Sequence, residues 1–190
     1  MQELIQTIKG ENYSSIHPRA FEHDGCIIDL GCASWNWSSI FIGKKRLIGI
    51  DPFEKHTPLG AELLNAIIGP FNGISWMNYD GFNSKVMQNG ILNQKMNLFN
   101  VFTWRKLCDE LNINNISILK MNIEGAEYPL LSSMDKSDFE KIDQIIVSFH
   151  DWMNPMWSNL TLSSIYLLEK SGFELQVIDS TYNWVLGLKK

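Results

Sequence analysis

The sequence predicts an α/β protein built on a mostly parallel sheet with helices on both faces. Short apolar runs at residues 26–30, 46–50 and 116–121 are each followed within three residues by a glycine or an acid, as buried parallel strands often are. Helix-like segments alternate with such runs, which is the pattern of βαβ units. The last two expected strands, 173–178 and 184–188, are joined by a short loop, so we expect them to pair antiparallel at the sheet edge.

The length and composition of the chain limit the classes of protein to which it can belong. Its 190 residues suit one domain, taken as residues 1–190, and 45% hydrophobic with 19% charged residues indicates a globular chain. The net charge of −5 argues against an extended nucleic-acid surface, which needs clustered Lys and Arg. No apolar run approaches the ~18 residues of a membrane span, and the N-terminus lacks the apolar core of a signal peptide. The three cysteines are odd in number and have no metal-ligand spacing, and Cys26 and Cys32 lie too far apart along a strand to pair easily, so we expect a reducing, cytoplasmic environment.

The first half of the chain is expected to alternate between strands and short helices. Residues 1–25 form an N-terminal extension, a helix followed by a loop, ahead of the strand at 26–30. A short helix at 37–42 connects this strand to the next. Residues 61–64 are expected to be helical and to lead into a third strand at 65–69.

The second half shows a less regular section before the pattern resumes. The residues after Asn72-Gly73 alternate as in an exposed strand, whereas residues 80–97, rich in Asn, Gly and Ser, predict a mobile excursion. Another strand is expected at 97–102. The remaining expected elements are a helix at 103–111 capped by Thr103, a strand at 116–121, a helix at 126–134, a strand at 142–149 and a helix at 160–170 that ends at Gly172.

Acidic residues lie at or just beyond the carboxyl ends of three predicted strands. Asp29 precedes Gly31 at the end of the first, Asp51 ends the second, and Glu124 follows the strand at 116–121. Charge is costly to bury without partners, so acids at such places usually face a cleft. In open α/β sheets, ligands bind outside the carboxyl ends of the strands. The three strand ends therefore predict a nucleotide-type site.

The loop after the first strand indicates which nucleotide ligand fits. An acid about 20 residues beyond such a loop binds ribose hydroxyls in dinucleotide folds, and Asp51 has this spacing from Asp29. A pyrophosphate binder needs a glycine-rich loop, whereas Gly31 is the only glycine from residue 31 to residue 36. This favours a ligand without a pyrophosphate, such as an adenosyl sulfonium. A nicotinamide cofactor is the weaker alternative. In a purely structural alternative, Asp51 binds no ligand and only solvates the end of its strand.

Candidate reaction residues lie at the end of the strand at 142–149. We expect His150 to act as a general base, since histidine titrates near neutral pH, with Asp151 beside it. Glu124 either anchors the acceptor or caps the following helix, and Glu127 is expected to start that helix. Glu124, His150 and Asp151 are of types that bind divalent metals, but their spacing is not diagnostic, so no metal is assigned. The segment 152–157 is a substrate wall, a partner surface or a loop packed over the sheet.

Four groups of residues together resemble one known family. They are Asp29-Leu-Gly31, Asp51-Pro52, Asn65-Ala66 with Gly69, and above all Leu119-Lys-Met-Asn-Ile-Glu-Gly-Ala-Glu127. From about residue 25 to residue 188 the chain is similar to the FkbM family of S-adenosylmethionine-dependent class I methyltransferases.

The resemblance implies a Rossmann-like sheet of seven strands in the order 3-2-1-4-5-7-6, with the seventh antiparallel. It also implies O-methylation of a hydroxyl on a carbohydrate, a glycan or a small metabolite. The residues implied to hold S-adenosylmethionine are Asp29, Gly31, Cys32, Asp51 and Asn122.

Two positions depart from the family pattern. Trp35 stands at the second glycine of the family's Gly-Ala-Asn-x-Gly loop, and Asn122 stands where the family usually has Asp. An indole at that position fills part of the cofactor space, covers it or packs in the core. The alternative to an enzyme is therefore a catalytically inactive methyltransferase fold that serves as a binding module in a larger assembly. Neither the methyl acceptor nor the oligomeric state is readable from the sequence.

Overall fold

The computed structural model describes residues 3–78, 96–181 and 183–190. The mobile segment expected over 80–97 lies outside these ranges except at its last two residues, which form part of a strand. Along the described ranges, no helix combines the length and the apolar character that crossing a membrane requires.

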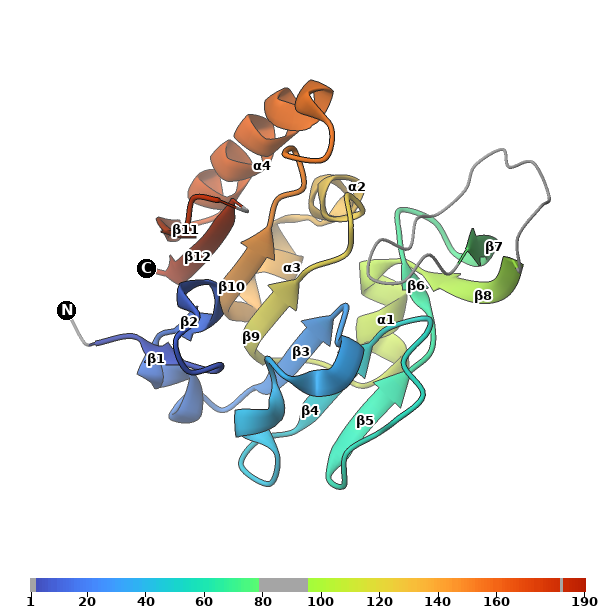
Figure 1. Cartoon of the computed structure of the whole chain (residues 1–190), viewed down its shortest axis with the longest axis horizontal. Coiled ribbons are helices and arrows are strands. Elements are labelled where there is room, and N and C mark those ends of the chain that lie inside the picture. The colour runs from blue at the N-terminus through green and yellow to red at the C-terminus, as the bar shows by residue number, and fades with distance from the viewer. Residues whose placement is uncertain (1–2, 79–95, 182) are drawn as a thin grey trace.

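A seven-stranded sheet forms the centre of the molecule (Figure 1). From one edge to the other its strands are β5 (Ala61–Leu64), β4 (Leu47–Ile50), β3 (Cys26–Leu30), β9 (Ile116–Met121), β10 (Ile142–Ser148), β12 (Trp184–Lys189) and β11 (Phe173–Asp179). β12 runs antiparallel to both of its neighbours, and the other neighbouring pairs are parallel. The predicted α/β fold with a large, mostly parallel sheet is confirmed.

The two faces of this sheet are covered differently. On one face, Ile28 and Leu119 pack in a core with the helices α1 (Trp104–Glu110), α2 (Glu127–Ser133), α3 (Lys136–Glu140) and α4 (Ser158–Lys170). On the other, Ile27 and Ile118 pack against Trp35 and Trp37 and against the N-terminal segment. Within the described residues, the α-helices therefore cover one face only, and the helices on the other face are short 3₁₀ turns, among them Ala33–Trp35 and Ser39–Phe41. The segment between β3 and β4 contains two Trp, three Ser and two Gly residues, which have modest to low helix propensity.

The N-terminal extension contains strands rather than the expected helix. β1 (Ile5–Gln6) pairs antiparallel with β2 (Ser15–Ile16), and the 3₁₀ helices η1 (Asn12–Ser14) and η2 (Pro18–Phe21) flank β2. The buried Ser14 hydroxyl donates to the carbonyl oxygens of Glu11 and Ile8. Such side-chain bonds to the backbone compete with helix formation.

Three short predictions in the first half are corrected by the structure. The helix expected at 37–42 is replaced by η3 (Ala33–Trp35) and η4 (Ser39–Phe41). The four residues expected to be helical at 61–64 are β5, the third strand of the sheet, which pairs with β4. The strand expected at 65–69 is only β6 (Ile67–Ile68) and belongs to another sheet. Four residues such as Ala61-Glu-Leu-Leu64 carry too little periodicity to separate helix from strand, so the neighbouring strand decides.

A small second sheet stands beside the carboxyl end of the main one. Its order is β6, β8 (Met96–Phe102) and β7 (Gly73–Asn78), and β7 and β8 are antiparallel, so both strands predicted here are confirmed. Phe99 of β8 meets Phe53 edge-on, with ring centroids 5.0 Å apart. The expected cap of α1 is also present, because the Thr103 hydroxyl accepts from the Lys106 N–H.

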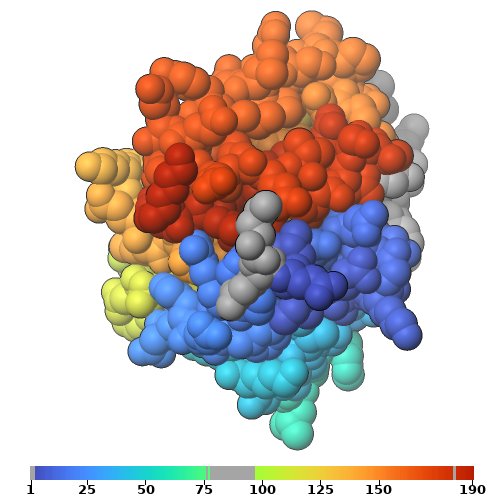
Figure 2. Space-filling model, turned by 90° about the vertical axis from the view of Figure 1, so that its left-hand side faces the viewer, coloured from blue at the N-terminus to red at the C-terminus, as the bar shows by residue number. Residues whose placement is uncertain are grey.

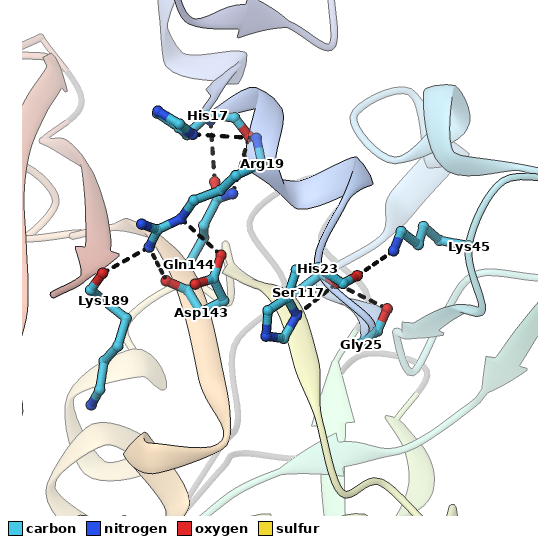
Figure 3. Close-up of polar contacts among 9 residues, drawn as sticks. All are labelled: His17, Arg19, His23, Gly25, Lys45, Ser117, Asp143, Gln144 and Lys189. Atoms are coloured by element: carbon cyan, nitrogen blue, oxygen red, sulfur yellow. Dashed lines mark hydrogen bonds and ion pairs between the residues drawn. The ribbon is translucent and has the colours of Figure 1, made fainter. Parts of the chain in front are cut away.

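Side chains at the amino ends of the strands fasten the N-terminal segment to the sheet (Figure 3). The fully buried Gln144 side chain both accepts from and donates to the backbone of His17, at 3.1 and 3.0 Å. Arg19 pairs with Asp143 at 2.9 Å and also donates to the Lys189 carbonyl. In the space-filling view the N-terminal residues, in blue, pack directly beneath the C-terminal part of the chain, in red (Figure 2). These contacts make the extension part of the fold.

Candidate functional site

Gly31 directly follows β3, where the chain passes close to the end of β9. Its φ of +77° is left-handed, and a Cβ there would lie 2.1 Å from the carbonyl oxygen of Asn122. The Asn122 N–H donates to the Leu30 carbonyl at 3.0 Å, which joins the two strand ends. Only glycine allows both the dihedral angle and the close approach. The structure therefore brings together two of the predicted cofactor residues, Gly31 and Asn122.

Asp29, in β3 just before Gly31, forms a buried ion pair with Lys120 of β9. Its Oδ1 is 2.7 Å from the Lys120 Nζ, and both side chains are almost fully buried. Lys120 also donates to the Gly31 carbonyl at 2.8 Å. The other oxygen of Asp29 has no hydrogen-bond partner among the described residues. Asp29, predicted at the cofactor, thus contacts Lys120 directly, and sequence reasoning assigned Lys120 no role although a lysine within an apolar strand is an unusual signal.

Asp51 follows β4 and organises the loop after it. Its Oδ1 accepts from the backbone N–H groups of Phe53 and Glu54 at 2.8 and 3.0 Å. Burial raises the pKa of Asp51, and these two hydrogen bonds act in the opposite direction. Among the described residues its second carboxylate oxygen has no hydrogen bond, so that oxygen is available at the strand end.

Trp35 packs into the sheet beside Cys32. The indole is 3% exposed, and a Cβ on Gly49 would lie 2.3 Å from its Cη2 atom and 2.6 Å from the Cys32 Sγ. The indole Nε1 donates to the His56 carbonyl at 2.7 Å. Cys32, predicted to contact the cofactor, is buried there, and burial raises the pKa of its thiol. The indole has taken a core position over Gly49.

The loop that carries Trp35 has strained backbone and one carboxylate partner. Ser34 and Trp35 have φ values of +63° and +56°, a left-handed conformation that is costly for residues other than glycine. The Ser34 N–H donates to Glu54 Oε2 at 2.6 Å, and Glu54 Oε1 accepts from the N–H of His56. Glu54 therefore links the two loops at the ends of β3 and β4. Nothing in its local sequence distinguishes it from a surface acid.

A second group of polar side chains lies at the ends of β9 and β10. His150 Nδ1 is 2.6 Å from Glu127 Oε1, and the His150 N–H donates to the same oxygen at 3.1 Å. His150 Nε2 faces Glu124 Oε1 at 3.7 Å. His150 and Glu127 are almost completely buried. Glu127 starts α2 as predicted, but its buried contact with His150 was not foreseen.

The charge of His150 follows from these neighbours. Burial lowers the pKa of His150, but its interactions with Glu124 and Glu127 outweigh that effect and raise the pKa to about 9. At neutral pH the ring is therefore an imidazolium held between two carboxylates.

Glu124 combines a strained backbone with an unused oxygen. Its φ is +58°, and its Oε2 is buried without a hydrogen-bond partner in the part of the chain that the structure describes. The following turn is held by Glu127, whose Oε2 accepts from the Gly125 N–H at 2.9 Å. Strained residues and unsatisfied buried polar atoms are typical of functional sites.

Asp151 and the segment after it border this group without joining it. The Asp151 Oδ1 accepts from the side chain of Asn183 in the loop before β12. Trp152, nearly half exposed, lies against the His150 ring with centroids 5.8 Å apart. Trp157 packs on Gly125, where a Cβ would lie 2.7 Å from the indole. Over the described ranges, no group of three or more His, Cys, Asp or Glu side chains has the arrangement of a metal site.

Comparisons with known proteins agree with the family that the sequence resembles. Residues 100–175 match the model of the methyltransferase FkbM domain. The fold is similar to the crystal structure of methyltransferase FkbM from Methylobacillus flagellatus KT, with 16% identity and a TM-score of 0.54. That match covers 93% of this chain and 47% of the other, so this chain spans about half the length of that protein. A comparison with curated proteins gives no match. The predicted resemblance to the FkbM family is confirmed.

Proposed function

We propose that this chain, whose residues 100–175 match the FkbM methyltransferase domain, is an S-adenosylmethionine-dependent O-methyltransferase. The acceptor in this proposal is a hydroxyl of a carbohydrate, a glycan or a small metabolite. The observation that carries the proposal is the buried, unpartnered Oε2 of Glu124, at the sheet edge where β3 and β9 meet. Such an oxygen requires a partner that the described residues do not supply.

The residues at the strand ends fit an adenosyl sulfonium in part. Gly31 leaves room for close approach to the backbone, Asp51 has an oxygen free for ribose hydroxyls, and the Asn122 side chain makes no hydrogen bond to the described residues. S-adenosylmethionine supplies an electrophilic methyl group on a cationic sulfonium. Asp29 acts through Lys120, and we do not assign Cys32 a contact because it is buried under Trp35.

The acidic group at the ends of β9 and β10 would serve the acceptor. Methyl transfer to a hydroxyl needs the oxygen aligned with the methyl carbon and a base for the proton. An imidazolium has no free lone pair, so in this proposal Glu124 Oε2 accepts the proton instead of His150. His150 and Glu127 then position Glu124, and Asp151 holds the neighbouring loop. The predicted base therefore becomes a positioning residue.

Calorimetric titration with S-adenosylhomocysteine tests the proposal. We expect saturable binding to the wild-type chain and binding about 10-fold or more weaker to Asp51→Asn, because a charged hydrogen bond contributes about 1.5–3 kcal/mol. Glu110→Gln, a similar change on exposed α1, is the control and should not alter the affinity. If the folded wild-type chain shows no saturable binding at millimolar ligand, the proposed enzyme is wrong.

The packing of Trp35 favours a second candidate, an inactive binding module. The indole occupies the space over Gly49 and is anchored at the His56 carbonyl. If the indole blocks the cofactor, Trp35→Gly should raise the affinity for S-adenosylhomocysteine at least 10-fold. The substitution should also relieve backbone strain, because glycine adopts the left-handed conformation of residue 35 without steric cost. If Trp35 belongs to a working site, the same substitution should lower the affinity.

A further inference from the structure

We propose that Lys120 is a positioning residue that holds the loop at residues 31–35 in its binding conformation, an inference that rests on the proposed function. Lys120 belongs to β9, whereas the loop follows β3, so the contact joins two strand ends. Glu124 follows β9, and Gly31 begins the loop. One ammonium group on β9, the strand that leads to Glu124, is thus bonded to the start of the loop on the proposed cofactor side.

The geometry around the Lys120 ammonium is complete. Its Nζ lies 2.7 Å from Asp29 Oδ1, 2.8 Å from the Gly31 carbonyl oxygen and 3.3 Å from the Leu30 carbonyl oxygen. A lysine ammonium has three donors, and each has an acceptor here. Two of the three acceptors are backbone carbonyls at the start of the loop. The hydrogen bond from Lys120 therefore fixes the orientation of the Gly31 carbonyl.

A charged pair at this position is not the choice that stability alone would make. Lys120 lies opposite Asp29 and Ile146 in the sheet, on the face where Ile118 is fully buried. Buried ion pairs replaced by apolar side chains of similar volume are often equally stable or more so. What an apolar residue cannot supply is a donor for the Gly31 carbonyl. Holding the loop is the role that remains for Lys120.

The loop itself needs such a restraint. Ser34 and Trp35 adopt left-handed conformations, which persist only where surrounding contacts over-determine them. Three backbone N–H groups of the loop are hydrogen-bonded, so their protection from exchange depends on its conformation. Gly31 donates to the Ile50 carbonyl, Ser34 to Glu54 and Trp35 to the Cys32 carbonyl. Hydrogen exchange at these amides measures the order of the loop without any ligand.

A pair of variants isolates the contact between Lys120 and the loop. Asp29→Asn removes the carboxylate charge but leaves the lysine its carbonyl acceptors, whereas Asp29→Asn with Lys120→Met removes the ammonium as well. We expect exchange at Gly31, Ser34 and Trp35 to be at least 10-fold faster in the double variant than in Asp29→Asn. Exchange in β10 should not change. S-adenosylhomocysteine should bind the double variant about 10-fold more weakly than it binds Asp29→Asn.

Lys189→Met is the matched control. Lys189 also donates to two backbone carbonyls, those of Ser171 and Phe139, but it lies at the other end of the sheet. The Lys189→Met substitution should leave hydrogen exchange at the Gly31, Ser34 and Trp35 amides unchanged. Equal loop exchange in the double variant and Asp29→Asn would overturn the proposal, and so would acceleration spread evenly over the sheet, because Lys120 would then serve stability alone.

Two further results separate this inference from the proposed function. If the double variant does not fold, Lys120→Arg replaces it, since the planar guanidinium keeps the charge but not the three contacts. Faster exchange confined to the loop supports the inference, and unchanged exchange overturns it. If the wild-type chain binds no S-adenosylhomocysteine while the exchange results are as expected, the proposed enzyme fails and the role of Lys120 in holding the loop stands.

Discussion

The amino and carboxyl ends of the central sheet differ in how well their polar groups are satisfied. At the amino ends, Gln144, Asp143 and Ser117 bind the N-terminal segment (Figure 3), and none of the residues drawn there has a buried side-chain polar atom without a partner. At the carboxyl ends, buried carboxylate oxygens of Asp29 and Glu124 have no partner among the described residues. The same sheet therefore has one end built for stability and one with unused hydrogen-bonding capacity.

Backbone strain shows the same asymmetry. Of the described non-glycine residues with positive φ, Ser34, Trp35, Glu124 and Asn183 lie at the carboxyl edge of the sheet, and Asn112 lies near the amino edge. Strain and unsatisfied groups lower stability, so they persist where a ligand or a reaction requires them. The comparison supports placing the functional site at the carboxyl edge independently of any relative.

The largest effect on stability is expected at the amino end. Gln144→Leu should lower the free energy of unfolding by about 3 kcal/mol, because it leaves the partly buried N–H and carbonyl of His17 without the side-chain partner that both now share. Urea unfolding measures the change, and Gln176→Leu, on an exposed position of β11, should change it by less than about 0.5 kcal/mol. Affinity for S-adenosylhomocysteine should not change. A variant as stable as the wild type would show that this network does not fasten the extension.

An intermediate effect, dependent on pH, is expected at the carboxyl end. The raised pKa of His150 means that its contribution is fully present below about pH 6.5, the ordinary pKa of histidine, and is lost as the pH rises through about 9. The stability difference between wild type and Glu127→Gln should therefore shrink by on the order of 2 kcal/mol between pH 6 and pH 9.5.

Urea unfolding at the two pH values measures this difference, and an NMR titration of His150 gives its pKa directly. In Glu127→Gln the pKa should fall toward 6.5, because one of the two carboxylates is lost. A difference that stays constant with pH would mean that His150 is neutral at pH 7. His150 would then recover the role of general base.

The smallest effect is expected from relief of strain in the loop. Ser34→Gly should raise the free energy of unfolding by about 0.5–1 kcal/mol, because glycine adopts a left-handed conformation without steric cost. The N–H of residue 34 keeps its bond to Glu54. The same change at Ser163, in the middle of α4, should lower stability by about 0.5 kcal/mol. Thermal unfolding compares the two, and a loss at both positions would contradict strain at Ser34.

The helices and strands that were predicted correctly from the sequence are those whose signals lie within the segment itself. The strands at 116–121 and 142–149 are six to eight residues long and mostly apolar, and the helix at 103–111 has its own cap at Thr103. The short segments at 37–42 and 61–64 failed because their structure depends on neighbours far along the chain. A few residues carry too little periodicity to decide between helix and strand.

The candidate site divides in the same way. That Gly31, Asp51, Asn122, Glu124 and His150 lie at strand ends is readable from the sequence, because each follows an apolar run directly or within three residues. Which side chain each one meets is not readable. The register of β3 and β9 pairs Asp29 with Lys120, and His150 meets Glu127 because α2 begins beside the end of β10. These pairings changed the interpretation of Asp29 and His150.

The sequence by itself determined the α/β class, the strands that form the middle of the sheet and the presence of acids at their carboxyl ends. These follow from hydrophobic periodicity and glycine positions, which act over a few residues. Only the tertiary structure decided that Trp35 enters the core, that one face lacks α-helices over the described residues, and that His150 is held as an imidazolium. The burial of a side chain and the charges around it depend on which segments pack together. Residues that are close along the chain do not determine those contacts.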